Sequence, residues 1–223
     1  ASARIDGERR GWPSADLSPL SFVLFLQNHD QIGNRPLGDR LTDLVEAELL
    51  EAAIALQLLC PQIPLVFMGE ESATVTPFLF FTDHHGDLAD AVREGRRREF
   101  SGFAGFGPGE NASKIPDPNE LETFTQSIPV PHGDRAGMRR AFYRDLLACR
   151  AAQLVPRLEG TKSIGAMAAG PASVVARWRL GDGACLVIAC NFGTEPVPWR
   201  EAPDDAHRIY AGAAQGASGG ELP

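Results

Sequence analysis

Two short apolar runs frame an amphipathic segment, and this arrangement restricts the fold more than any other feature. Residues 22–26 are a continuous run of Phe, Val and Leu, and residues 63–68 form a second apolar run. Such runs are typical of strands buried on both faces, as in parallel α/β sheets. Between them, residues 43–60 predict a helix with Asp43 as N-cap, ended by Pro61. The sequence therefore predicts a strand–helix–strand unit with parallel strands.

A cluster of polar side chains follows each apolar run. Residues 27–31 read Gln-Asn-His-Asp-Gln, and residues 69–71 read Gly-Glu-Glu. Because the carboxyl ends of parallel strands lie on one edge of a sheet, both clusters should share one rim. Carboxylates beside neutral hydrogen-bonding groups and nearby phenylalanines suit a carbohydrate, and glycoside cleavage needs two carboxyl groups. The pattern nominates Asp30 with Glu70 or Glu71; the alternative, that these residues cap helices and form structural ion pairs, stays open.

The remaining sequence changes character along its length. Residues 72–135 are mostly irregular, with a helix predicted over 87–99 that Asp87 caps, and a loop rich in Gly and Pro over 101–119. A second helix is predicted over 136–152. From about residue 158 the pattern alternates as in β-strands, with a turn at 181–183 between two of them. We therefore expect an α/β portion over residues 1–156 and a small all-β domain over 157–223.

Charge and composition exclude several classes of protein. The formal net charge is −8, and the only basic run, Arg96 to Arg98, predicts a solvated helix face, so no nucleic-acid partner is expected. No apolar run approaches the ~20 residues that span a bilayer, so no membrane partner is expected either. No spacing of metal ligands and no cofactor motif occurs, and we expect neither a metal nor a cofactor.

The four cysteines and the two chain ends carry further expectations. No cysteine pair has the C-x-x-C spacing, which favours reduced, mostly buried thiols in a cytoplasmic protein. The chain begins at Ala1 without a methionine and stops at Pro223 without a recognisable final element. We therefore expect a fragment of a longer protein. Trp178 and Trp199, in the β portion, are interpreted as packing residues or as platforms for sugar rings.

Specific motifs resemble one enzyme family. Residues 22–35, FVLFLQNHDQIGNR, resemble the strand-seven motif of the alpha-amylase family of glycoside hydrolases, and residues 64–71, PLVFMGEE, resemble its strand eight. The stretches TPFLFFTDHH at 76–85 and AVREGRRREF at 91–100 are similar to the members that release trehalose from trehalose-capped maltodextrins. The resemblance implies the last two strand–helix units of a (β/α)8 TIM barrel, followed by a small antiparallel β C-terminal domain. The helix over 136–152 would be the eighth barrel helix.

The resemblance also implies roles for individual residues. The family uses three acidic residues, of which only the one after strand seven has a counterpart here, Asp30, as transition-state stabiliser. The nucleophile and the acid/base match no position in this chain, so Glu70 and Glu71 become structural residues. His29 matches a histidine that hydrogen-bonds the sugar at the cleaved bond. The further substrate-binding candidates are Asn28, Gln31, Arg35 and Phe81; a Gly33–Asn34 turn held by Arg35 explains part of this set as well.

The implied activity belongs to a complete barrel. It is that of a retaining glycosidase that cleaves the alpha-1,4 bond next to the terminal trehalose of malto-oligosyltrehalose, within trehalose biosynthesis from maltodextrin. This chain by itself should be inactive, because one matched carboxylate cannot supply a nucleophile and an acid. Its uncovered strands should promote self-association or binding to the missing part of the barrel. The alternatives are a non-catalytic carbohydrate-binding module and a glycogen branching or debranching enzyme; Gln31 argues against branching, where Glu is expected.

Overall fold

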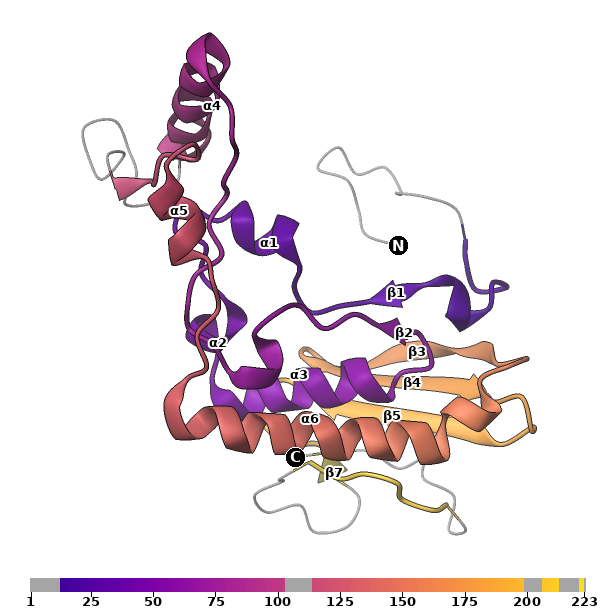
Figure 1. Ribbon diagram of the computed structural model, residues 1–223. Helices are drawn as coiled ribbons and strands as arrows, with labels where there is room; N and C mark the ends of the chain where they lie inside the picture. The colour runs from indigo at the N-terminus through magenta and orange to yellow at the C-terminus, as the bar shows by residue number, and fades with distance from the viewer. Residues whose placement is uncertain (1–12, 103–113, 199–205, 213–220, 223) are drawn as a thin grey trace. The chain divides into compact units, whose positions relative to one another are not determined.

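The computed structural model describes residues 13–102, 114–198, 206–212 and 221–222 (Figure 1). Contacts divide the chain into two compact units, each built from stretches that are separate in sequence. The first unit contains described residues from 1–24, 51–65 and 144–223, and the second contains those from 25–50 and 66–143. Helices α3, Ala47–Leu59, and α6, Gly133–Gln153, contribute to both units. The division at residue 157 that the sequence suggests stays a prediction.

A pair of parallel strands organises the first unit. Strand β1, Val23–Leu24, follows the short 3-10 helix η1, Pro19–Ser21, and pairs in parallel with β2, Ile63–Pro64. The side-chain amide of Gln57, from the connecting helix α3, donates to the backbone oxygens of Leu24 and Leu65, at 3.3 and 2.6 Å. One buried side chain therefore holds the helix to both strands. The predicted strand–helix–strand order and the parallel pairing are confirmed.

The two strands are less covered than the apolar runs predict. Val23 is 54% exposed and Ile63 is 46% exposed, so the expectation of strands buried on both faces is wrong for this chain. The reason is that, within the described residues, β1 and β2 form a sheet of two strands with no third strand beside them. This exposure agrees with the expectation that part of a barrel leaves apolar surface uncovered.

The helical segment after β1 also begins differently from the prediction. Residues Leu41–Leu44 form a separate short helix, α2, and Val45 is extended, so α3 begins only at Ala47. Asp43 lies inside α2 and is not an N-cap, which corrects the prediction. The free N–H of Leu41 is instead satisfied by the side-chain oxygen of Gln27, at 3.1 Å. A residue 14 positions upstream therefore satisfies a free N–H at the start of α2.

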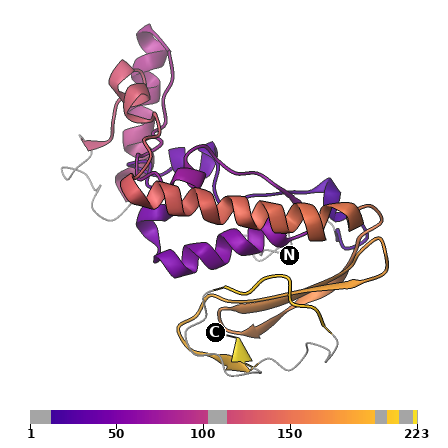
Figure 2. The same cartoon turned by 60° about the horizontal axis from the view of Figure 1, so that its bottom comes forward.

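An antiparallel sheet of three strands forms the other part of the first unit (Figure 2). Its strands run in order β3, Lys162–Gly170, β4, Ser173–Arg179, and β5, Cys185–Asn191. The hairpin of β4 and β5 was predicted, whereas β3, rich in Gly and Ala without alternation, was not. Trp178 is 6% exposed, which supports the packing interpretation; Trp199 lies outside the described residues. Val197–Pro198 (β6) pairs with Glu221–Leu222 (β7).

Arg150 joins α6 to the end of α3. Its guanidinium is buried and donates to the backbone oxygens of Leu58 at 2.9 Å, Cys60, and Gln62 at 2.8 Å. Leu58 lies in the last turn of α3, and Cys60 and Gln62 follow it, so no further helical N–H is available for these carbonyls. Arg150, in α6, therefore caps the C-terminal end of α3 with its side chain. The 3-10 helix η5, Val155–Arg157, follows α6 in the chain.

The cysteines are free thiols, as predicted, but only one of them is buried. Burial raises the pKa of the Cys60 thiol to about 12. Cys149 and Cys190 are half-buried, and Cys185 is exposed, so the expectation of mostly buried thiols is wrong. Cys185 opens the strand β5 directly after the turn at 181–183, where the sheet no longer covers its side chain.

The second unit consists of short helices joined by long connections. These are α1, His29–Gly33, α2, η2, Glu70–Ser72, α4, Gly86–Glu99, η3, Phe100–Gly102, α5, Leu121–Gln126, and the first part of α6. Helix α4 was predicted, but its N-cap is His85, and Asp87 lies within the first turn instead. Residues 103–113 of the predicted loop lie outside the described residues. Among the described helices, none is long and apolar enough to cross a membrane.

The Arg150 contacts predict a large effect on stability. Arg150→Met should lower the free energy of unfolding by about 3 kcal/mol, because several buried carbonyls lose a charged donor. Urea unfolding of the purified chain measures this change. Arg144→Met, on the exposed side of the same helix, is the matched control and should change it by less than about 0.5 kcal/mol. Equal effects of the two substitutions would contradict the assigned role.

Candidate functional site

The first polar cluster begins a helix. Asn28 is extended and its side-chain oxygen accepts the N–H of Gln31 at 2.9 Å, so Asn28 is the N-cap of α1. His29 and Asp30 are therefore the first two helical residues, and both are exposed. The cap explains why this sequence turns into a helix directly after an apolar run. It also holds His29, Asp30 and Gln31 on a single turn with their side chains accessible.

Asp30 is held by the end of the same short helix. The side-chain amide of Asn34 donates to Oδ1 of Asp30 at 3.3 Å, and the backbone N–H of Asn34 donates to the Asp30 carbonyl at 3.0 Å. Arg35 instead pairs with Asp39 at 3.1 Å. The predicted Gly33–Asn34 turn is confirmed, and Arg35 holds it through its backbone N–H, which donates to the Ile32 carbonyl at 3.0 Å.

Arg96 also anchors that turn, and no pattern in the sequence indicates this contact. Its Nη2 donates to the backbone oxygen of Gly33 at 2.6 Å, and its Nη1 lies 3.4 Å from Oδ1 of Asn34. The guanidinium lies 4.6 Å from the ring centres of both Phe80 and Phe100. Arg96 is 8% exposed, so the prediction of a solvated helix face is wrong for this residue. Helix periodicity turns one of three consecutive arginines inward, which composition does not reveal.

The second polar cluster meets the first through a buried carboxyl group. Oε2 of Glu70 accepts the N–H of Phe67 at 3.2 Å and lies 3.5 Å from the Tyr143 hydroxyl, and the Gln27 side chain is close enough to lower the pKa of Glu70. Burial raises the pKa of Glu70 to about 7, opposed in part by these hydrogen bonds and by Arg40. Glu71 is exposed and accepts the N–H of Gly69 at 3.1 Å. The shared rim is confirmed, and both glutamates bind their own turn.

Arg40 fixes the connection that follows β2. It is 1% exposed, and it donates to the backbone oxygens of Met68 at 2.9 Å and Thr76 at 2.6 Å. Its guanidinium also lies 5.5 Å from the centre of the Phe67 ring. Burial lowers the pKa of Arg40. Sequence reasoning missed this residue, because a single arginine in a polar loop carries no local signal of burial.

Phe81 belongs to a row of aromatic rings. Phe67, Phe78, Phe81 and Phe124 contact one another edge to face, with ring centres 5.1, 5.7 and 5.1 Å apart. Phe81 is half-buried between Phe78 and Phe124, and Phe124 is 46% exposed. Such edge-to-face pairs stabilise a rigid surface. The structure therefore places Phe81 in packing, and sugar binding by Phe81 stays a prediction.

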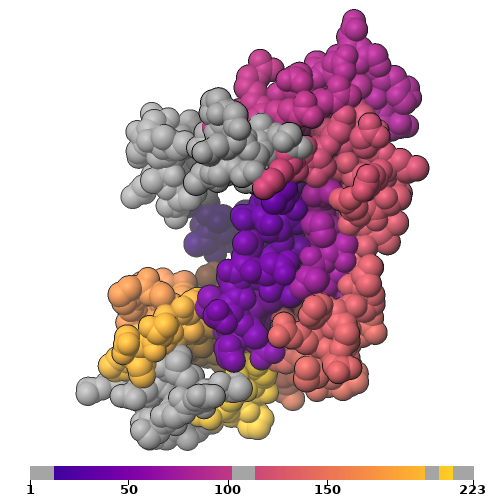
Figure 3. Space-filling model, turned by 90° about the vertical axis from the view of Figure 1, so that its left-hand side faces the viewer, coloured from indigo at the N-terminus to yellow at the C-terminus, as the bar shows by residue number. Residues whose placement is uncertain are grey.

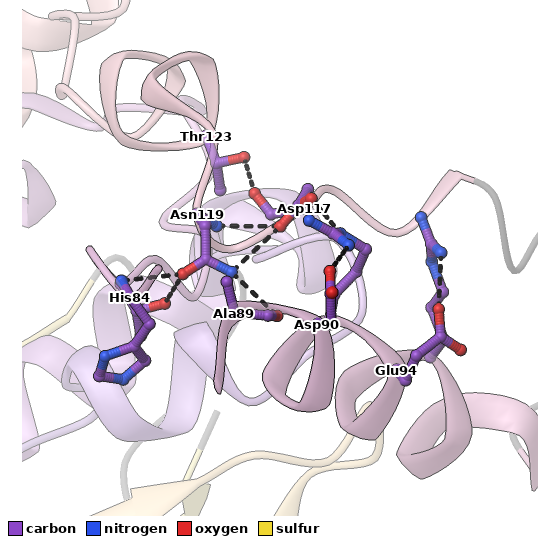
Figure 4. A network of polar contacts seen from close by, with 10 residues as sticks. His84, Ala89, Asp90, Glu94, Asp117, Asn119 and Thr123 are labelled. Atoms are coloured by element: carbon purple, nitrogen blue, oxygen red, sulfur yellow. Dashed lines mark hydrogen bonds and ion pairs between the residues drawn. The ribbon is translucent and has the colours of Figure 1, made fainter. Parts of the chain in front are cut away.

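A polar network ties the connection beyond Phe81 to helix α4 (Figure 4). The side chain of Asn119 accepts from Thr82 at 2.8 Å and from the N–H of His84 at 3.0 Å, and donates to the Ala89 carbonyl at 3.2 Å. Asp117 pairs with Arg93 beside it. In Figure 3 the magenta atoms of α4 lie against the pink to salmon atoms of the segment that follows it in the chain. Asp83 and His84 stay exposed on this supported stretch.

The described residues contain no group of three or more His, Cys, Asp and Glu side chains that could hold a metal ion. The exposed polar groups of α1 are the imidazole of His29, the carboxylate of Asp30 and the amide of Gln31. The backbone that carries them is anchored by the buried side chain of Arg96. This arrangement can bind hydroxyl groups and can stabilise a positive charge nearby, as a sugar substrate requires.

Comparison with protein families matches the end of the chain. Residues 164–223 match a family model described as a domain of unknown function, DUF3459. The matched region contains strands β4 and β5 and the last part of the chain.

Curated relatives carry one name. A protein of Deinococcus radiodurans named malto-oligosyltrehalose trehalohydrolase is 48% identical over 152 residues, which are 66% of this chain and 24% of that protein. A protein of the same name from Mycobacterium tuberculosis is 36% identical over 196 residues, which are 84% of this chain and 32% of that protein. This chain thus spans about a quarter to a third of the length of these relatives.

One solved structure is similar in both sequence and fold. It is the crystal structure of a protein from Salmonella typhimurium provisionally named an alpha amylase, with a TM-score of 0.82 and 41% identity. The similarity covers 97% of this chain and 36% of that protein. These comparisons confirm the resemblance to the alpha-amylase family and to its trehalose-releasing members: this chain is similar to one portion of such proteins.

The buried position of Glu70 predicts a dependence of stability on pH. The ordinary pKa of its carboxyl is 4.5, and burial raises it to about 7 in the folded chain. The contribution of Glu70 is therefore complete below pH 4.5 and is lost as the pH rises through 7. Relative to Glu70→Gln, wild-type stability should fall by about 3 kcal/mol between pH 4.5 and 7.5, at about 1.4 kcal/mol per pKa unit.

Urea unfolding at these two pH values measures the difference between wild type and Glu70→Gln. The matched control is Glu48→Gln, at an exposed position in the first turn of α3, which should leave the pH dependence unchanged. A difference that stays constant with pH would show that Glu70 is ionised in the folded chain.

Proposed function

We propose that this chain is the C-terminal part of a retaining glycoside hydrolase that cleaves the alpha-1,4 bond next to the terminal trehalose of malto-oligosyltrehalose. The observation that carries the proposal is the exposed pair His29 and Asp30, at the start of a helix that directly follows a strand of a parallel pair. This pair lies in a chain that is 48% identical over 152 residues to a curated protein named for that activity. The rest of the catalytic machinery would lie outside these residues, and we place the protein in the cytoplasm.

The architecture we propose is the closing part of a barrel. Strands β1 and β2, with helices α3 and α6, would be the last two strand–helix units of a (β/α)8 barrel, and residues 157–223 would be its antiparallel C-terminal domain. The parallel pairing of β1 and β2 and the exposure of Val23 and Ile63 support this assignment. Six further strands would cover these apolar faces, supplied by the same polypeptide or by an associated chain.

The proposed mechanism assigns a defined task to Asp30. Positive charge develops at the anomeric carbon and the ring oxygen as the glycosidic bond breaks, and the ring flattens. A carboxylate that accepts hydrogen bonds from two sugar hydroxyls favours the distorted ring over the relaxed chair. Since Asp30 is already oriented by Asn34, little reorganisation is needed when the transition state forms. The nucleophile and the acid/base, which this chain lacks, would perform the covalent steps.

The other predicted residues take supporting roles in this proposal. His29 would donate to a hydroxyl of the sugar at the cleaved bond, and Gln31 would contact the next ring. Asn28 acts through the helix that it caps, because its side-chain oxygen is occupied by the N–H of Gln31. Arg35 is engaged by Asp39, so any contact with substrate would use the remaining nitrogens of its guanidinium. Phe81 would offer an apolar surface to a sugar ring from the aromatic row.

The intact mass of the protein in its source cell is the first test. A mass near 60–65 kDa, about the size of a barrel with flanking domains, is expected from typical domain lengths. The purified chain of 223 residues should then release no trehalose from maltotriosyltrehalose. A natural product near 24 kDa that binds maltodextrin without cleaving it would contradict the proposal and favour a carbohydrate-binding module.

Substitution of Asp30 tests its assigned role in the natural polypeptide. Asp30→Asn should lower kcat for trehalose release by at least about 100-fold, the order found when one preorganised transition-state contact is removed. The matched control is Asp145→Asn, at an exposed position on α6, which should keep kcat within about twofold because surface changes are nearly neutral. Initial rates with maltotriosyltrehalose measure both. Full activity of Asp30→Asn would remove Asp30 from the site.

A further inference from the structure

We propose that Arg96 is a positioning residue for catalysis: it orients Asn34, and Asn34 in turn orients the carboxylate of Asp30. The inference rests on the proposed function and deepens it, because it names a residue from an element far along the chain that prepares the site. Arg96 does not contact Asp30 itself, and it lies 66 positions away in the sequence. Its effect reaches the carboxylate through one intervening amide.

The geometry around Arg96 leaves its guanidinium little freedom. Phe80 and Phe100 both lie with their ring centres 4.6 Å from it, and Glu99 accepts from Nη1 at 3.1 Å. An arginine held by aromatic faces keeps its planar set of donors in a fixed direction. Burial lowers the pKa of Arg96, but guanidinium groups stay protonated in proteins. A charged donor is therefore aimed permanently at the end of α1.

Two contacts transmit that direction to α1. Nη2 donates to the Gly33 oxygen at 2.6 Å, which anchors the last turn of the helix that begins with His29. Nη1 lies 3.4 Å from Oδ1 of Asn34. Because a guanidinium only donates, this contact requires the oxygen of the Asn34 amide to face Arg96 and its NH2 group to face away. That NH2 group donates to Oδ1 of Asp30 at 3.3 Å.

The consequence for catalysis concerns orientation and not binding. Without Arg96 the Asn34 amide can rotate, and the Asp30 carboxylate loses the contact that selects its rotamer. Interactions that matter only in the transition state change kcat, whereas uniform binding changes KM. Loss of Arg96 should therefore lower kcat and leave KM nearly unchanged. A lysine at this position keeps a positive charge but cannot serve both acceptors with a planar fork.

The test uses the natural polypeptide with maltotriosyltrehalose as substrate. We expect Arg96→Met and Arg96→Lys each to lower kcat by about 10- to 50-fold, with KM within about threefold, as for the loss of orientation alone. Arg98→Met and Arg98→Lys are the matched controls, since Arg98 is exposed two positions away on α4, and both should keep the wild-type kcat. Thermal unfolding of every variant is measured in parallel, because it shows whether a loss of kcat comes from a loss of folded protein.

A double-mutant cycle separates positioning from a structural role. If Arg96 acts through Asp30, Arg96→Met added to Asp30→Asn should lower the residual kcat by less than about twofold. A structural role would lower kcat by the same factor in both backgrounds, and this outcome would overturn the inference. Asn34→Ala, which leaves Arg96 in place, should by itself lower kcat as Arg96→Met does. This variant keeps the test valid if Arg96→Met fails to fold.

The outcomes also distinguish the inference from the function on which it rests. No trehalose release by the natural polypeptide overturns the proposed function and the inference together. Wild-type kcat in Asp30→Asn removes Asp30 from the site and overturns the inference, while the trehalose-releasing activity stands. A large loss in Asp30→Asn, with wild-type kcat in Arg96→Met and Asn34→Ala, overturns only the role of Arg96. A large loss in all three variants, with the non-additive cycle, supports both.

Discussion

The pairing of β1 with β2 is the constraint on which the rest of the structure depends. Two backbone hydrogen bonds, from Ile63 to Phe22 and from Leu65 to Leu24, fix the parallel register. Gln57 adds a third link, because its amide donates to the carbonyls of Leu24 and Leu65 from the helix between the strands. The chain therefore leaves both strands in one direction. The two polar clusters follow within a few residues, and the Gln27 side chain of the first lowers the pKa of Glu70 in the second.

Buried arginines order the long connections that secondary structure does not. Arg40 donates to carbonyls of the connection after β2, Arg96 to the end of α1, and Arg150 to the end of α3. In each case the acceptors are backbone oxygens without a helical or strand partner, and such groups are costly when buried. Arginine suits this task because its planar donors reach several carbonyls while its charge survives burial. The candidate site is therefore held by groups that never touch a substrate.

The uncovered apolar surface of β1 and β2 agrees with the similarity to longer proteins. Curated relatives match this chain over a quarter to a third of their length, and the similar crystal structure extends well beyond the matched portion. Parallel strands are normally covered on both faces. Val23 and Ile63 carry side chains suited to such cover, yet about half of the surface of each is exposed here. The sequence of the strands thus fits a larger sheet than the one that these residues form.

The sequence alone determined what local patterns encode. Apolar runs gave the parallel strands, alternation and a glycine turn gave the hairpin of β4 and β5, and the motif around Asp30 gave the resemblance that the comparisons confirm. Only the tertiary structure decided which side chains turn inward. It buried Arg96 but left Arg98 exposed, placed the side-chain oxygen of Gln27 on the N–H of Leu41, and anchored the Gly33 carbonyl on Arg96. The physical reason is that these contacts join residues 14 to 63 positions apart, where no periodicity or spacing carries a signal.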